Sequence, residues 1–171
     1  DLTGQAAPRT VASLTSGGGN LAWGPADATL LYLAQLLPGM QGGQGIFALD
    51  LVSGATRSFA HELEACPDCL ATDASGTPYV QILDHLESWL ARLDLSVDKA
   101  ATRSASPELV HLAKLAHFPG EVDGITVSAD GSTIAVVGST RDTLSDLWMG
   151  PVDGPLERVT NLNPDLESLP F

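Results

Sequence analysis

One stretch in the last third of the chain limits what the protein can fold into more than any other. Two short runs, residues 124–127 and 133–137, alternate apolar with small or polar side chains and flank the turn Ala129-Asp130-Gly131. An Asp-Gly pair between two alternating runs is the strongest short-range pattern of a β-hairpin. Two more short runs follow, at 147–149 and 156–160. The stretch therefore predicts one antiparallel sheet of four strands.

The same order of runs and turns occurs twice more upstream. The first copy lies within residues 20–62 and contains the turn Ser53-Gly54; the second, the weaker match, lies within 68–106 and contains Ser75-Gly76. With the stretch at 120–163 they form three units spaced by about 50 residues, which is typical of the blades of a β-propeller. We predict an all-β protein: residues 1–171 form a partial β-propeller of about three four-stranded antiparallel blades.

A propeller needs about 4 to 8 blades to close its ring. Three blades leave two faces uncovered, and repeated units that cannot cover these faces are not stable alone. Either several copies or another chain complete the ring, or this chain is part of a larger protein. We favour the larger protein and leave homo-oligomerisation open.

Composition agrees with a folded domain and argues against two classes of partner. The chain is 44% hydrophobic, and its 17 Gly and 11 Pro are spread over the expected turns. Eight basic and 21 acidic residues give a net charge of −13, which repels nucleic acids and anionic membranes. No apolar run approaches the roughly 20 residues that span a bilayer. We expect a cytoplasmic protein; export stays open, because the sequence starts at Asp1 without a Met.

The two cysteines stand together in Cys66-Pro67-Asp68-Cys69, a spacing found in redox pairs and in zinc sites. No βαβ pattern surrounds them, and the nearest histidines, His61 and His85, do not have metal-ligand spacing. We therefore favour a loop disulfide between Cys66 and Cys69, or two free thiols, over metal binding or redox catalysis. No metal site and no cofactor is expected.

Patterns of nucleophilic catalysis are missing from the sequence. No serine has the Gly-x-Ser-x-Gly spacing of a nucleophile elbow, and the four histidines belong to no motif. Trp23, Trp89 and Trp148 recur once per unit, which favours packing between sheets over ligand stacking. Residues 107–115 could form a short helix or an outer strand. We assign no catalytic residue to this chain.

The third unit carries a family resemblance. Residues 127–131, 134–137 and above all Arg158-Val159-Thr160-Asn161-Leu162-Asn163-Pro164-Asp165-Leu166 resemble the final propeller blade of the prolyl oligopeptidase family, in its acylaminoacyl-peptidase branch. In that family a segment Leu-Thr-x-x-Asn-x-x-Leu precedes an α/β-hydrolase domain, and here Val159 replaces the first Leu. The resemblance covers about residues 120–169 and is weaker, at the level of general blade pattern, over residues 20–100.

The resemblance implies a serine peptidase whose catalytic triad lies in a hydrolase domain expected after Phe171. The parent protein would be an acylaminoacyl peptidase, an oligopeptidase or an exopeptidase, with carboxypeptidases included. This chain would be its noncatalytic propeller portion, which screens short peptides for the hydrolase domain. The alternative is a stand-alone binding scaffold that resembles TolB-like propellers.

Blade topology predicts which end of the propeller faces such a hydrolase domain. In an up-and-down blade, the connection between the second and third strands lies at the same end of the propeller as the point where the chain leaves the fourth strand. The connections at 35–45, 82–88 and 139–145 should then face the active site. These connections contain Arg141, Asp142, His85 and Glu87. We expect the four side chains to lie near the substrate or the contact with the hydrolase domain. Arg141 is the best candidate for holding a peptide carboxylate by bidentate bonds, and solvated loop charges are the alternative.

Overall fold

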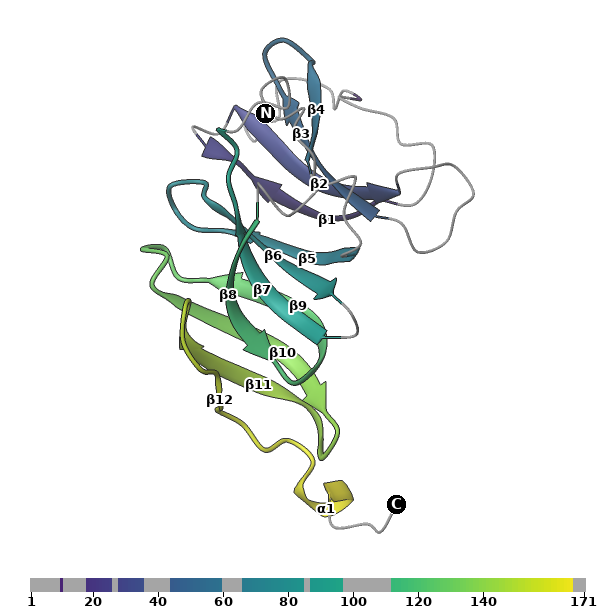
Figure 1. Cartoon of the computed structure of the whole chain (residues 1–171), viewed down its shortest axis with the longest axis vertical. Coiled ribbons are helices and arrows are strands. Elements are labelled where there is room, and N and C mark those ends of the chain that lie inside the picture. The colour runs from purple at the N-terminus through teal and green to yellow at the C-terminus, as the bar shows by residue number, and fades with distance from the viewer. Residues whose placement is uncertain are drawn as a thin grey trace, which may run out of the picture.

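The computed structural model describes residues 10, 18–25, 28–35, 44–59, 66–84, 87–96 and 112–167. In these residues the chain forms three four-stranded antiparallel sheets, stacked one after another along the long axis of Figure 1, and one helical turn, α1 (Pro164–Glu167). The strands of the first sheet are β1 (Gly18–Trp23), β2 (Thr29–Gln35), β3 (Gln44–Asp50) and β4 (Thr56–Phe59). Those of the second are β5 (Cys66–Thr72), β6 (Pro78–Asp84), β7 (Glu87–Leu93) and β8 (Leu112–Phe118). Those of the third are β9 (Gly120–Val127), β10 (Thr133–Thr140), β11 (Thr143–Pro151) and β12 (Glu157–Arg158). The predicted all-β fold is confirmed.

Aspartates close the tight turns of the sheets. In the third sheet, the carboxylate of Asp130 accepts hydrogen bonds from the Ser128 hydroxyl at 2.6 Å and from the amide and hydroxyl of Ser132 at 3.1 and 2.8 Å. These bonds, that of the Ser128 hydroxyl first, lower the pKa of Asp130 to about 2. Gly131 then takes a left-handed φ of +71°, which glycine adopts without steric cost. The Asp-Gly pattern in the sequence therefore has a local physical cause.

Successive turns also contact one another. Ala74, in the turn between β5 and β6, donates its amide hydrogen to the carbonyl of Ala129, in the turn between β9 and β10, at 3.0 Å. Gly76, at φ +78°, lies so close to the backbone of Gly24 and Pro25 that a Cβ there would clash with it. The turns after the first strands of the three sheets thus touch, and backbone meets backbone at both of these points.

Two apolar cores hold the sheets together. Leu31, Ile46, Val80 and Ile82 belong to the core between the first and second sheets. Its counterpart between the second and third sheets is formed by the following buried side chains: Cys69, Leu90, Ala116, Phe118, Val122, Ile134 and Val136. The first strands β5 and β9 pack against each other, as do β1 and β5. Sheets that pack face to face around their first strands are the blades of a propeller.

Two of the three tryptophans pack as expected. Trp148 meets Phe118 edge to face in the second core, with ring centroids 5.4 Å apart at 81°, and Trp89 packs against the first core. Trp23 is instead 56% exposed in β1. The expected packing role therefore fits Trp89 and Trp148 but not Trp23.

The second sheet extends beyond the predicted range of 68–106. Its fourth strand, β8, runs to Phe118 and pairs with β7 from Leu93↔Leu112 to Ser88↔Phe118. Residues 112–115, left open between a helix and an outer strand, belong to this strand; residues 107–111 lie outside the described part. Residues 97–111 contain no Gly, so the sequence offers no tight-turn pattern from which this pairing could have been predicted. The other two sheets span residues 18–59 and 120–158, whereas the predicted ranges were 20–62 and 120–163.

The outer face of the third sheet carries apolar side chains without a cover from the described residues. Val137 is 45% exposed and Met149 is 44% exposed, on the side opposite the second core. A blade in the middle of a propeller would bury this face against its neighbour. The exposed face agrees with a partial propeller.

Candidate functional site

The ends of several strands meet at one end of the propeller. Gly120, the first residue of β9, pairs with Thr140, the last residue of β10. The turn Arg141-Asp142 therefore lies beside Pro119, which joins β8 to β9. Pro119 and Glu87, the first residue of β7, line the same cleft. Connections after second strands and exits from fourth strands thus share one end, as the up-and-down topology predicts.

The cleft lies between the second and third sheets and has a volume of about 730 Å³. Apolar side chains form part of its wall: Leu83, Phe118, Pro119 and Val122. Three acidic side chains also line it, Asp68, Glu87 and Glu121, together with Gln81, Ser88, His117 and Gly120. A hollow of this size, apolar with a few polar groups, is typical of ligand sites in proteins.

Gln81 is the unusual member of this lining. Its side chain is 4% exposed, and it stands in β6 between Cys69 of β5 and Leu90 of β7. Within the described part of the chain, the carboxamide oxygen Oε1 has no hydrogen-bond partner. A buried acceptor without a donor costs about 1–3 kcal/mol, so nearly all such groups in folded proteins are paired. Gln81 is therefore a candidate for contact with a ligand.

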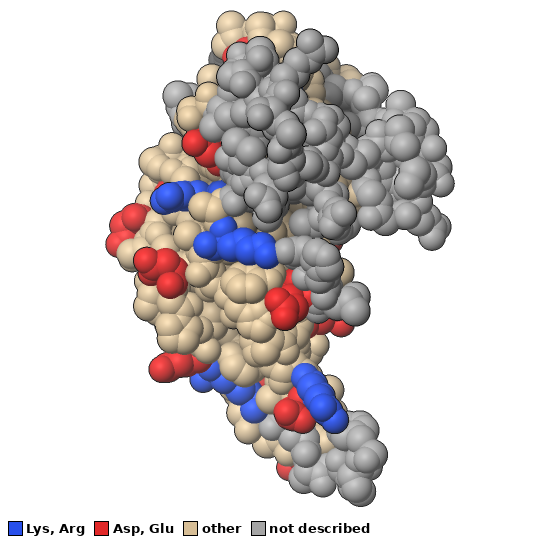
Figure 2. All heavy atoms as spheres, viewed as in Figure 1, with Lys and Arg blue, Asp and Glu red and all other residues tan. Residues whose placement is uncertain are grey.

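Among the described residues that line the cleft, the charged side chains are acidic and none is Lys or Arg; Arg141 lies beside the cleft, outside this lining. On the second sheet, Lys114 Nζ lies 4.6 Å from the ring centroid of Trp89, and His117 packs against the same ring at 5.0 Å. On the face shown in Figure 2, basic side chains over the middle and lower parts lie among acidic ones. The cleft therefore favours positively charged ligands over anions.

The structure places the predicted site residues differently with respect to the cleft. Glu87 is exposed and lines it. Arg141 and Asp142 are exposed in the β10–β11 turn, beside the cleft but not among its lining residues. The amide of Asp142 donates to the Thr140 hydroxyl at 3.3 Å. His85 lies outside the described residues.

Cys69 is a free thiol, buried in the second core. Both cysteines stand in β5, where Cys66 pairs with Leu83 and Cys69 with Gln81. The register of β5 shifts between Pro67 and Cys69. Of the two expectations, a disulfide or free thiols, the free thiol fits Cys69. Burial, with Asp68 and Asp123 nearby, raises the pKa of the Cys69 thiol to about 11.

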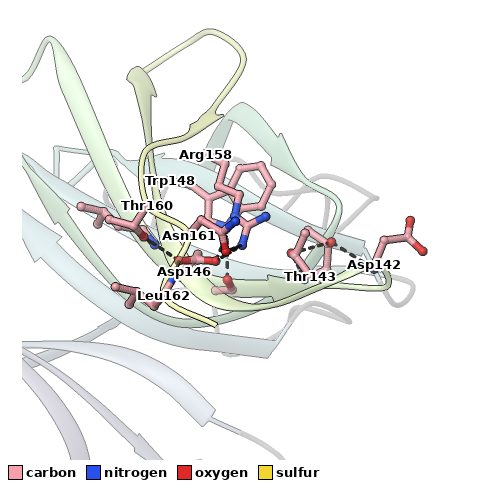
Figure 3. A network of polar contacts seen from close by, with 11 residues as sticks. Asp142, Thr143, Asp146, Trp148, Arg158, Thr160, Asn161 and Leu162 are labelled. Atoms are coloured by element: carbon pink, nitrogen blue, oxygen red, sulfur yellow. Dashed lines mark hydrogen bonds and ion pairs between the residues drawn. The ribbon is translucent and has the colours of Figure 1, made fainter. Parts of the chain in front are cut away.

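A second polar cluster, which the sequence analysis did not predict, centres on Asp146 of β11 (Figure 3). Its carboxylate is 1% exposed and accepts hydrogen bonds from the Thr160 hydroxyl at 2.6 Å, from the Leu162 amide at 3.0 Å and from Arg158 Nε at 2.9 Å. Arg158 Nη2 also forms an ion pair with it and donates to Asn161 Oδ1 at 3.1 Å. These bonds, that of Thr160 first, lower the pKa of Asp146 despite its burial.

The Asp146 cluster ties the segment after β12 to the third sheet. Thr160 also accepts a hydrogen bond from the Leu147 amide at 2.9 Å, and the Val159 amide donates to the Leu147 carbonyl at 2.7 Å. The segment is the one that carries the family resemblance. Its Arg158 and Thr160 were visible in the sequence, but their common acceptor, Asp146, lies at least 12 residues away along the chain.

In the described part of the chain, no three His, Cys, Asp or Glu side chains converge as metal ligands. Within the same residues, no helix has the length and apolar character needed to cross a membrane.

Comparison with known proteins identifies the fold. No protein-family model and no curated protein matches the chain. Among solved structures, the β-propeller domain of the Trilobed protease from Pyrococcus furiosus is similar, with a TM-score of 0.54 and 13% identity over 84% of this chain and 38% of that chain. This chain is a partial β-propeller. TolB from Acinetobacter baumannii is also similar, with a TM-score of 0.42 and 19% identity over 91% of this chain and 46% of that one. The partial propeller thus spans less than half of either structure.

Proposed function

We propose that this chain is the noncatalytic propeller portion of a serine peptidase of the prolyl oligopeptidase family, in its acylaminoacyl-peptidase branch. In this role it screens short peptides for an α/β-hydrolase domain of the same parent protein. The chain contributes no catalytic residue. Its part is to present the cleft end of the propeller to the hydrolase domain and to admit peptides by size and charge.

The anchored segment at 158–162 is the observation that carries this proposal. The segment resembles the end of the family's last blade, and Asp146 holds it against β11 through Thr160, Leu162 and Arg158. Asp146 lies near the start of β11, just after the β10–β11 turn at the cleft end. The chain therefore leaves the third sheet near the cleft, which is where a following hydrolase domain would have to begin.

Arg141 is proposed to hold the carboxylate of a peptide at the edge of the cleft. It is exposed beside Pro119, and its planar guanidinium can bind a carboxylate by two parallel hydrogen bonds. In the parent enzyme, Arg141→Ala should raise KM for peptides with a free carboxyl end and leave KM for their amides unchanged. Equal KM values of R141A and wild type for both forms would contradict this role.

The parent activity can be tested on the protein purified at its natural length. We expect a fluorophosphonate probe to label one serine outside residues 1–171, and the labelled protein to lose hydrolysis of N-acetyl-alanyl p-nitroanilide and of short peptides. An intact mass near 17.7 kDa with no second polypeptide and no labelled serine would refute the proposal. That result would leave the scaffold alternative.

A further inference from the structure

We propose that Asp146 is a positioning residue for the peptidase: its carboxylate fixes the direction in which the chain leaves the third sheet, and so the width of the passage between the propeller and the hydrolase domain. The largest peptide that can enter then depends on a side chain that touches no substrate. The link to peptide size rests on the proposed function, whereas the hold on residues 158–162 rests on the contacts of Asp146.

The fourth strand of the third sheet is much shorter than that of the second. β8 has seven residues and pairs with β7 from its first residue to its last. β12 has two residues and ends at Arg158, and one further backbone bond reaches the Leu147 carbonyl. From there on, Thr160 and Leu162 donate to the carboxylate of Asp146. A side chain thus does for the end of the third sheet what a backbone ladder does for the second.

The second sheet shows that a blade can be built without this carboxylate. In both sheets, a basic residue of the fourth strand contacts the side chain that lies two positions before its own partner on the third strand. In the second sheet, Lys114 Nζ lies 4.6 Å from the ring centroid of Trp89; in the third, Arg158 forms an ion pair with Asp146. A buried ion pair is often no more stabilising than apolar packing in its place. We therefore attribute Asp146 to its additional bonds with the following segment and not to the stability of the blade.

The Asp146 carboxylate controls several consecutive residues. Two nitrogen atoms of Arg158, the hydroxyl of Thr160 and the amide of Leu162 all donate to it (Figure 3). Arg158 also donates to Asn161 Oδ1 at 3.1 Å. Helix α1 starts two residues after Leu162, so the carboxylate sets where the chain goes next. Because hydrogen bonds to a charged acceptor are the stronger ones, loss of this one charge loosens the whole segment.

Limited digestion with trypsin tests the hold on the segment without a measurement of activity. The protein is used at its natural length, and trypsin cleaves after Arg158 when the backbone around it opens. Asp146→Asn keeps the size of the side chain and removes its charge, so cleavage after Arg158 should become at least about tenfold faster. Cleavage after Arg141, in the exposed β10–β11 turn, should keep its rate and is the internal control.

Two threonine variants provide a matched pair. Thr160→Val keeps the shape of the side chain, removes one donor to Asp146 and leaves the ion pair with Arg158 in place. Cleavage after Arg158 should then become about fivefold faster. Thr126→Val makes the same change at an exposed position of β9, opposite Ala135 and outside this cluster, and should be cleaved like wild type.

Hydrolysis of a short and a long substrate tests the link to peptide size. The short one is N-acetyl-alanyl p-nitroanilide. The long one begins with the same N-acetyl-alanyl unit and continues as a Gly/Ser-rich peptide of about 30 residues, whose coil spans about 30 Å. D146N and T160V should raise the ratio of kcat/KM for the long to that for the short substrate at least about fivefold, and keep kcat for the short substrate within about twofold. A general loss of structure would lower both values together and leave the ratio unchanged.

Two results would overturn the inference: cleavage after Arg158 at the same rate in D146N, T160V and T126V, or a ratio of long to short substrate equal to that of wild type in all three. If D146N does not fold, T160V decides alone. Failure of the proposed function gives a different result, because neither substrate is then hydrolysed, while the digestion still decides whether Asp146 positions the segment.

Discussion

The contact between Phe118 and Trp148 should contribute measurably to the packing of the second sheet against the third. Phe118, at the end of β8, is 0% exposed, and its ring meets that of Trp148 of β11 edge to face at 5.4 Å. Phe118→Leu removes about three buried carbons, which costs about 2 kcal/mol of unfolding free energy. It also removes the aromatic contact, which is worth about another 1 kcal/mol. We expect F118L to lower the unfolding free energy by about 3 kcal/mol.

A double-mutant cycle separates the aromatic contact from the general loss of packing. Unfolding in urea, followed by far-UV circular dichroism, is measured for wild type, F118L, W148L and the double variant. Because the contact is lost only once, the double variant should be more stable than additivity predicts by about 1 kcal/mol. This coupling free energy requires that the two sheets pack as in the structure.

Phe47→Leu provides the matched control. Phe47 of β3 stacks on Tyr32 at 5.3 Å in the first sheet, away from the second core. F47L and W148L should therefore be additive within about 0.5 kcal/mol. A coupling between Phe118 and Trp148 no larger than in this control would refute the packing of the second and third sheets as neighbouring blades.

Three further predictions concern other parts of the chain. Asp146→Asn should speed amide hydrogen exchange over residues 159–167, and unchanged exchange would contradict the anchor. Because the fold lowers the pKa of Asp146, its carboxylate stabilises the folded protein at pH values above the ordinary aspartate pKa. Wild type should therefore lose protection from exchange as the pH falls below that pKa. Cys69, with its pKa raised to about 11, should resist iodoacetamide at pH 7 until the protein is unfolded, as read by peptide mass spectrometry; alkylation in the native state would contradict its burial. Both Gly54 and Gly76 have a positive φ, but only at Gly76 would a Cβ meet backbone atoms. Gly54→Ala should lower the unfolding free energy by about 1–2 kcal/mol, and Gly76→Ala should lower it further. Equal urea midpoints for the two variants would contradict the turn contact.

The hairpins could be predicted from the sequence because their causes are local. At Asp130 and Gly131 the carboxylate, the serine hydroxyls and the left-handed glycine all lie within five residues of one another. Alternating runs on either side then determine which face of the strand is buried. Repetition of this unit was enough to predict the all-β fold and the number of blades.

Features that depend on distant residues could not be predicted in the same way. β8 follows β7 after residues 94–111 and is recognised as a strand only through its pairing with β7. The anchor joins Asp146 to residues that lie 12 to 16 positions farther along the chain. The cleft unites Gln81, Glu87 and Glu121 from three strands, and of these only Glu87 was a candidate. The cysteine pair was expected in a loop for a related reason, whereas Cys66 and Cys69 lie within β5.

The contacts between successive turns have a consequence for the size of the ring. Where Ala74 meets Ala129, and Gly76 meets Pro25, neighbouring blades touch by backbone and no side chain separates them. Such contacts hold one edge of each blade close to the next and leave the wedge angle to be set by the bulk of the apolar side chains farther out. Rings of eight to four blades need wedge angles of about 45° to 90°. Substitutions that thicken the turns or thin the cores would therefore change how many blades complete a circle.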